Sequence, residues 1–134
     1  MTVLPQPDDL TSLVLRTSFG GDLAWREFEA ALRDESATLV SDPAYADATV
    51  ESLVAADAGA EDDDKLTYLF LADATTLADA GHPLLAVDLY TEAGRTFRLP
   101  LRWFEDVSAN LAIANMDFDE FADHVDESGA YLGE

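Results

Sequence analysis

The stretch 66–72 places the strongest constraint on the fold, because it is apolar on both faces of an extended chain. Its leucine and aromatic side chains alternate in the order LTYLFLA, so both sides of a strand would carry large apolar groups. Such a strand needs cover on both sides, which helices packed on the two faces of a sheet supply. We therefore predict a central strand here, within a layered domain that contains helices and strands.

The other elements follow from apolar spacing and turn residues. The run 12–17 is a second strand apolar on both faces, and a loop with glycine near its end favours an antiparallel hairpin between the last two strands. Helices are indicated where apolar residues recur at spacings of three and four. The predicted strands are 12–17, 38–40, 66–72, 84–90 and 96–99, the hairpin loop is 91–94, and the predicted helices are 22–34, one from near Thr49, 103–111 and one from near Asp117.

This order predicts a single-domain α/β or α+β fold. We expect a mixed sheet of about five strands with helices packed on it, ending in a C-terminal helix–corner–helix. A chain of 134 residues is long enough for one sizeable core. Residues 1–9, with two prolines, are predicted to be an extended lead-in, and residues 10–134 to form the domain.

Composition excludes several kinds of chemistry. The chain has no cysteine, which excludes disulfides, thiol catalysis, iron–sulfur clusters and the usual structural zinc sites. No window approaches the roughly 18 apolar residues of a membrane-spanning helix, and the N-terminus lacks the pattern of a signal peptide. We expect a soluble cytoplasmic protein without a bound cofactor.

The charge balance is strongly acidic. Acidic residues number 28 against 7 basic ones, which gives a formal net charge of −21. Such a field repels nucleic acid and anionic membranes and attracts basic partners. A GC-rich genome or a saline interior would also explain the bias, including the single lysine and the excess of aspartate over glutamate. Functional and compositional interpretations of the acidity both stay open.

The stretch 110–125, NLAIANMDFDEFADHV, is the most distinctive part of the chain. Asp117 followed by Glu120 fits a capping box, in which acidic side chains accept the open amides of a helix start. The two asparagines can satisfy open backbone groups at the corner between two helices. We predict a partner-binding surface on the outer edge of this stretch, comprising Asp117, Asp119, Glu120, Asp123, Asn110 and Asn115.

An alternative ligand crevice is predicted at the ends of two strands. Ser18 and Asp73 both follow predicted parallel strands, where ligands of open α/β sheets bind. No nucleophile-elbow pattern accompanies them, and Asp73 is also explained as an Asx-turn or a helix cap. The acidic runs 62–64 and 117–123 lack the alternating ligands and the glycine of a calcium loop. We therefore predict no catalytic residue and no metal site.

Several segments together resemble a known family. The series SLVLRT, DATTL, HPLLAVDLY, RTFR and NLAIANMDFDEFADHVD, with Trp25 in a helix, resembles a small uncharacterised domain family of high-GC bacteria, catalogued as a domain of unknown function. The resemblance extends from Leu13 to Asp126. It implies a recurring standalone domain and supplies no catalytic residues.

These observations rank three functional hypotheses. The first is a non-enzymatic acidic domain that binds a basic partner protein, as an immunity or inhibitor protein does in a toxin system. The alternatives are a small-molecule enzyme or ligand-binding domain that uses the crevice near Ser18 and Asp73, and a DNA mimic whose carboxylates stand in for phosphates. We expect no direct binding of nucleic acid or membrane. The oligomeric state and the identity of the partner stay open.

Overall fold

A computed structural model describes residues 4–8, 11–32, 37–61, 65–113 and 117–131, so the prediction for Asn115 lies outside the described residues. The expected α/β class is confirmed, with a five-stranded mixed sheet and helices packed on it. The strands are β1 (Ser12–Arg16), β2 (Ala37–Val40), β3 (Tyr68–Ala72), β4 (Leu84–Asp88) and β5 (Thr96–Leu99). The helices are α1 (Asp22–Leu32), α2 (Val50–Ala58), α3 (Ala74–Ala78), α4 (Phe104–Ala112) and α5 (Phe118–Ala122), with 3-10 turns η1 (Pro43–Tyr45) and η3 (Leu101–Trp103).

The strand order is β2-β1-β3-β4-β5. β1 pairs in parallel with both β2 and β3, whereas β3, β4 and β5 pair antiparallel in sequence order. The predicted hairpin is therefore confirmed, and β3 occupies the middle of the sheet as its two apolar faces predict.

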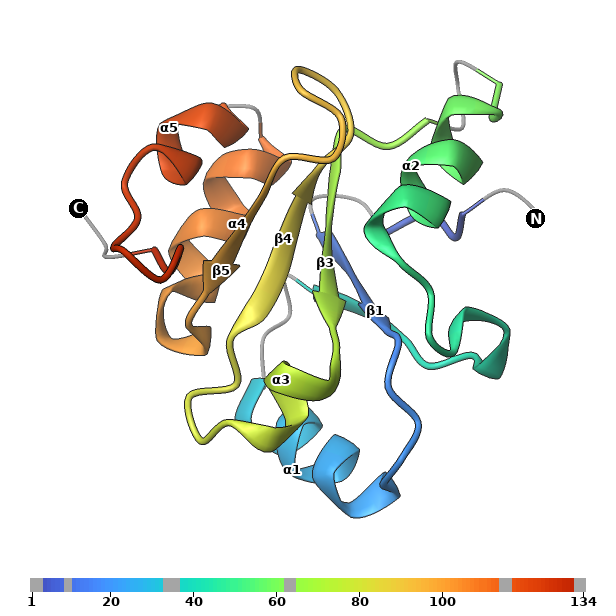
Figure 1. Ribbon diagram of the computed structural model, residues 1–134, viewed down its shortest axis with the longest axis vertical. Coiled ribbons are helices and arrows are strands. Elements are labelled where there is room, and N and C mark those ends of the chain that lie inside the picture. The colour runs from blue at the N-terminus through green and yellow to red at the C-terminus, as the bar shows by residue number, and fades with distance from the viewer. Residues whose placement is uncertain (1–3, 9–10, 33–36, 62–64, 114–116, 132–134) are drawn as a thin grey trace.

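Helices cover both faces of the sheet (Figure 1). On one face, α1, α4 and α5 contribute Phe28, Phe104 and Phe121 to a large aromatic core. On the other face, α2 packs Leu53 beside Leu4 of the N-terminal segment. Leu4 is almost fully buried, so the N-terminal segment, although it has no helix or strand in its described residues, takes part in the core.

The β4–β5 hairpin loop is longer than predicted. β4 ends at Asp88, and residues 89–95 form the connection. The reason is the Asp88 side chain, which accepts hydrogen bonds from the amides of Tyr90, Thr91 and Glu92 and so turns the chain out of the strand. Gly94 has a φ of 97°, a conformation that glycine adopts without steric cost.

Two short segments were not predicted from the sequence. The five-residue helix α3 follows β3 directly, with Asp73 as its N-cap; an element this short has too few turns to show apolar periodicity. At the C-terminal end, the amide of Arg98 in β5 donates to Gly129 O, and Tyr131 N donates to Arg98 O. The C-terminal segment therefore covers part of an edge strand.

Candidate functional site

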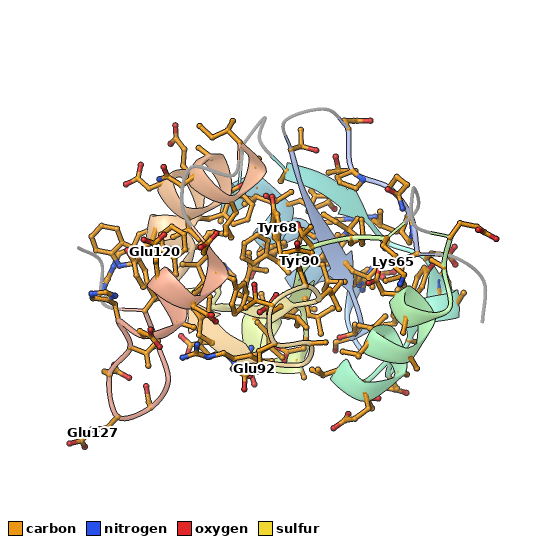
Figure 2. All side chains as sticks on the ribbon, turned by 90° about the horizontal axis from the view of Figure 1, so that it is seen from above. Lys65, Tyr68, Tyr90, Glu92, Glu120 and Glu127 are labelled. Atoms are coloured by element: carbon orange, nitrogen blue, oxygen red, sulfur yellow. The ribbon has the colours of Figure 1, made fainter. Side chains whose placement is uncertain are left out.

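One end of the sheet, where β3 begins and β4 ends, presents a surface that we call the tyrosine end. It is defined by Thr67, Tyr68, Tyr90, Thr91 and Asp117. Seen from above in Figure 2, Tyr68 and Tyr90 lie together near the centre, with Lys65 toward α2 on one side and Glu120 on the other. The distinctive stretch 110–125 therefore contributes to this end of the molecule, because Asp117 lines the same pocket as both tyrosines.

Tyr90 is the most exposed large apolar side chain in the described part of the structure, with 79% of its surface accessible. The loop beneath it is held firmly. Asp88 is 1% exposed, its carboxylate accepts the Tyr90 amide at 2.9 Å and the Glu92 amide at 2.9 Å, and its backbone pairs with Arg95 and Gly94. An exposed ring on a fixed backbone loses little conformational entropy on binding, which favours a role as an interface anchor.

Pockets flank Tyr90 on two sides. A small one, of about 160 Å³, lies between Tyr90, Tyr68 and the start of α5. A larger one, of about 490 Å³, runs between Tyr90 and α2 and is lined by Val54, Lys65 and Leu66. The tyrosine end is therefore a surface with a protruding ring and two adjacent hollows, a shape suited to complementary docking.

Some of the predicted partner-binding residues make contacts within the protein. Asp119 and Asp123 both accept hydrogen bonds from Arg95, at 2.8 and 2.6 Å, so an arginine of the hairpin loop neutralises part of the expected acidic edge. These two bonds raise the pKa of Arg95. The two ion pairs connect the hairpin loop to α5 and so help to fix the position of this loop, which carries Tyr90, relative to α5.

Asp117 and Glu120 form the predicted capping box at the start of α5. The Glu120 carboxylate accepts the Asp117 amide at 2.7 Å, which confirms that a helix begins at this point. Both side chains are exposed, so they contribute to the acidic surface as well as to the helix start.

Asn110 lies apart from the tyrosine end, in a pocket of about 390 Å³ that Trp103, Asp106, Phe121 and Tyr131 also line. Its side-chain amide donates to Asp106 O at 2.8 Å. The indole Nε1 of Trp103 is buried and has no acceptor among the described residues. Two residues of the predicted surface, Asp117 and Asn110, therefore line two different pockets.

The alternative crevice brings Ser18 and Asp73 near each other, because the Thr17 amide donates to Ala72 O across β1 and β3. Ser18 O accepts a bond from the Nε of buried Arg16, at 2.8 Å. These contacts hold together the ends of β1 and β3, which is a structural role.

The Asp73 carboxylate is occupied by neighbours. It makes a two-bond pair with Arg98, at 2.9 and 2.8 Å, and accepts the Thr76 amide at 3.1 Å. Burial alone would raise the pKa of Asp73, but the bonds from Arg98 and Thr76 outweigh it and hold that pKa below its ordinary value. This carboxyl stays ionised at neutral pH, whereas a general acid needs a raised pKa.

Within the part of the chain that the structure describes, no group of three or more histidine, aspartate or glutamate side chains has an arrangement suited to a metal ion. No helix in the described ranges is long and apolar enough to cross a membrane.

Sequence reasoning missed Tyr90 as a surface residue, because it placed Tyr90 at the end of a strand. The available signal was Asp88, since an aspartate side chain can accept hydrogen bonds from backbone amides a few positions on and so favours an Asx-type turn. The pairing of Arg95 with two carboxylates 24 and 28 positions away has no local signal.

Comparisons with known proteins bear on identity alone. No curated protein matches the chain. A family model matches almost its whole length, which confirms the resemblance to an uncharacterised domain. Because that match covers residues 11–134, the chain belongs to the family described as Domain of unknown function (DUF6924).

Proposed function

We propose that this protein is a non-enzymatic interaction domain that binds a basic protein through the tyrosine end. The observation that carries the proposal is Tyr90, an exposed aromatic ring on a loop fixed by a buried carboxylate and flanked by two pockets. Tyrosine is among the residues that contribute most to binding energy at interfaces, because its large ring buries apolar area and its hydroxyl still finds a partner.

The charge supports a basic partner. Glu92 and Asp117 are exposed beside Tyr90 in the hairpin loop and at the start of α5, and the whole chain carries −21. Complementary charge speeds encounter and suppresses the wrong partners. A basic partner is consistent with this chain being the immunity or inhibitor protein of a toxin system. On this proposal, the chain acts in the cytoplasm of a high-GC bacterium.

The alternatives receive less support. In the strand-end crevice, Asp73 is held by Arg98 and Thr76, which leaves a ligand few open groups. A DNA mimic needs carboxylates in two extended rows, whereas exposed acidic residues of the described chain are scattered over α1, α2, α4, α5 and the loops.

Capture from the native host at low salt, followed by affinity measurement with the purified partner, tests the proposal. We expect a stoichiometric basic protein whose affinity falls steeply with salt. Tyr90→Ala should weaken binding by about thirtyfold, the effect of losing a hot-spot residue worth about 2 kcal/mol. Asp117→Lys should slow association by about tenfold, through the field beside the anchor.

The matched control is Glu27→Lys on α1, the helix at the opposite end of the molecule from the tyrosine end in Figure 1; Glu27 is also exposed. It changes the net charge as Asp117→Lys does and should alter affinity by less than about threefold. Failure to capture any protein, or equal losses for Glu27→Lys and Asp117→Lys, contradicts the proposal. Stabilisation of the isolated fold by potassium chloride would favour the compositional origin of the charge.

A further inference from the structure

The small pocket beside Tyr90 has a composition that points to a particular side chain of the partner. Rings and aliphatic groups form most of its lining, from Tyr68 and Tyr90 on one side and from Leu111 and Phe118 on the other. Its volume of about 160 Å³ admits one slender side chain and no second large group. The walls therefore suit an unbranched aliphatic stem.

Carboxylates determine the charge that this stem should carry. Asp88 also lines the pocket, but both of its oxygens already accept backbone amides. Asp117 lines the same pocket and is exposed, at the edge where α5 begins. A cation that enters along the apolar walls would meet the Asp117 carboxylate, and aromatic rings such as those of the two lining tyrosines attract cations as well.

We infer that the pocket receives a lysine side chain of the partner protein, with the methylenes between Tyr68, Tyr90 and Leu111 and the ammonium at Asp117. Lysine combines a flexible apolar stem with a compact charge, whereas the planar guanidinium of arginine needs a wider site with paired acceptors. This inference rests on the proposed function, since it assigns the chemistry of one contact within the tyrosine end.

Hydrogen bonds hold the Tyr68 side chain in place. Tyr68 OH lies 2.6 Å from Ser12 Oγ, which lies 2.6 Å from Ser108 Oγ. Burial raises the pKa of Tyr68 more than the Ser12 hydrogen bond lowers it. The ring therefore stays neutral and fixed by the buried hydroxyls, and the wall of the pocket has a defined position without any ligand.

A titration monitored by NMR tests the inference without a known partner. The probe is Nα-acetyl-lysine methylamide, added to the ¹⁵N-labelled full chain at constant ionic strength. We expect saturable shifts at the amides of Thr67, Tyr90, Thr91 and Asp117, with a dissociation constant on the order of 1–10 mM, typical of so small a ligand. The matching arginine derivative should bind at least about fivefold more weakly, because of the pocket width.

Two comparisons isolate the charge and the site. Acetylation of the probe at Nε removes its charge and should abolish the saturable shifts. Asp117→Asn should weaken binding by at least about fivefold, while Glu27→Gln on α1, with the same change in net charge and no place in the pocket lining, should change it by less than about twofold. Shifts that do not saturate, binding of the acetylated probe, or equal effects of the two variants overturn the inference.

The two proposals fail separately. If Tyr90→Ala abolishes capture of a partner but the lysine probe does not bind, the tyrosine end is an interface and the lysine assignment is wrong. If the probe binds as expected but no captured partner depends on Tyr90, the pocket is correctly assigned and the proposed function is wrong.

Discussion

The pair between Asp73 and Arg98 allows a stability prediction that can be worked out from the structure. The carboxylate joins α3 to β5, because it caps α3 through the amide and hydroxyl of Thr76 and binds Arg98 of β5. Replacing Asp73 by alanine removes all of these contacts. Replacing it by asparagine keeps an oxygen for the Thr76 amide but removes the charge and places an amide donor against the guanidinium.

The expected size lies between two known limits. Two unit charges 4 Å apart attract by about 4 kcal/mol at an effective dielectric constant of about 20, and loss of solvation offsets much of this. Exposed ion pairs contribute about 0.2–1 kcal/mol, whereas breaking a fully buried pair costs about 3–5 kcal/mol. The side chains of Arg98 and Asp73 are 26% and 25% exposed. We therefore expect Asp73→Asn to cost about 1–2 kcal/mol, and Asp73→Ala about 1 kcal/mol more for the lost cap.

Urea unfolding followed by circular dichroism measures these changes, and a double-mutant cycle with Arg98→Met isolates the pair. The cycle should give a coupling energy of about 1 kcal/mol or more, since residues in one ion pair do not contribute additively. A cost for Asp73→Asn below about 0.5 kcal/mol, or a coupling energy of zero within error, would refute the reasoning.

The same pair should make stability depend on pH. The pKa of Asp73 is lower in the folded chain than its ordinary value of 3.8. Its stabilisation is therefore fully present above the unfolded pKa and is lost as the pH falls through the folded pKa. The difference in free energy of unfolding between the wild type and Asp73→Asn should be constant from pH 7 to about 5 and shrink below about pH 4. A difference that stays constant down to pH 2 would contradict the assignment.

Substitutions at three other positions should lower the free energy of unfolding by different amounts, according to the burial of the contacts that each removes. Asp88→Ala should cost about 3 kcal/mol in urea unfolding, because it leaves three partly buried amides of the hairpin loop without their acceptor, and Asp88→Asn should cost less; equal costs would contradict this reading. Arg95→Ala should cost at most about 1 kcal/mol, since its partners Asp119 and Asp123 are partly exposed, and high salt should erase the difference. Phe104→Ala should cost about 3–5 kcal/mol in the same assay, because Phe104 is fully buried in the aromatic core, and a cost below about 1 kcal/mol would mean that the core is not packed there.

The main elements could be predicted from the sequence because each rests on a local pattern. The buried strands show continuous apolar runs, and α1 and α4 show apolar residues at helical spacing. Asp117 and Glu120 mark the start of α5 through a capping box. In each case the residues that determine the element are a few positions apart, so the signal survives without knowledge of the tertiary structure.

The candidate site could be predicted only in part, because its character depends on contacts between distant segments. Asp117 was identified, but its neighbours in the pocket, Tyr68 and Tyr90, come from β3 and the hairpin loop. The partial neutralisation of Asp119 by Arg95 depends on how the hairpin loop meets α5. Such contacts follow from the packing of the layers and have no counterpart in spacing along the chain.

The C-terminal segment has a consequence for how copies of this protein behave toward one another. Gly129 and Tyr131 occupy the backbone hydrogen-bonding groups of Arg98 on the outer side of β5. An uncovered edge strand is a template for the strand of another molecule, and proteins that leave one open risk sheet extension between chains. Here residues 129–131 cover the part of that edge at Arg98. Truncation before residue 129 would therefore expose β5 and should promote self-association through the sheet rather than through the tyrosine end.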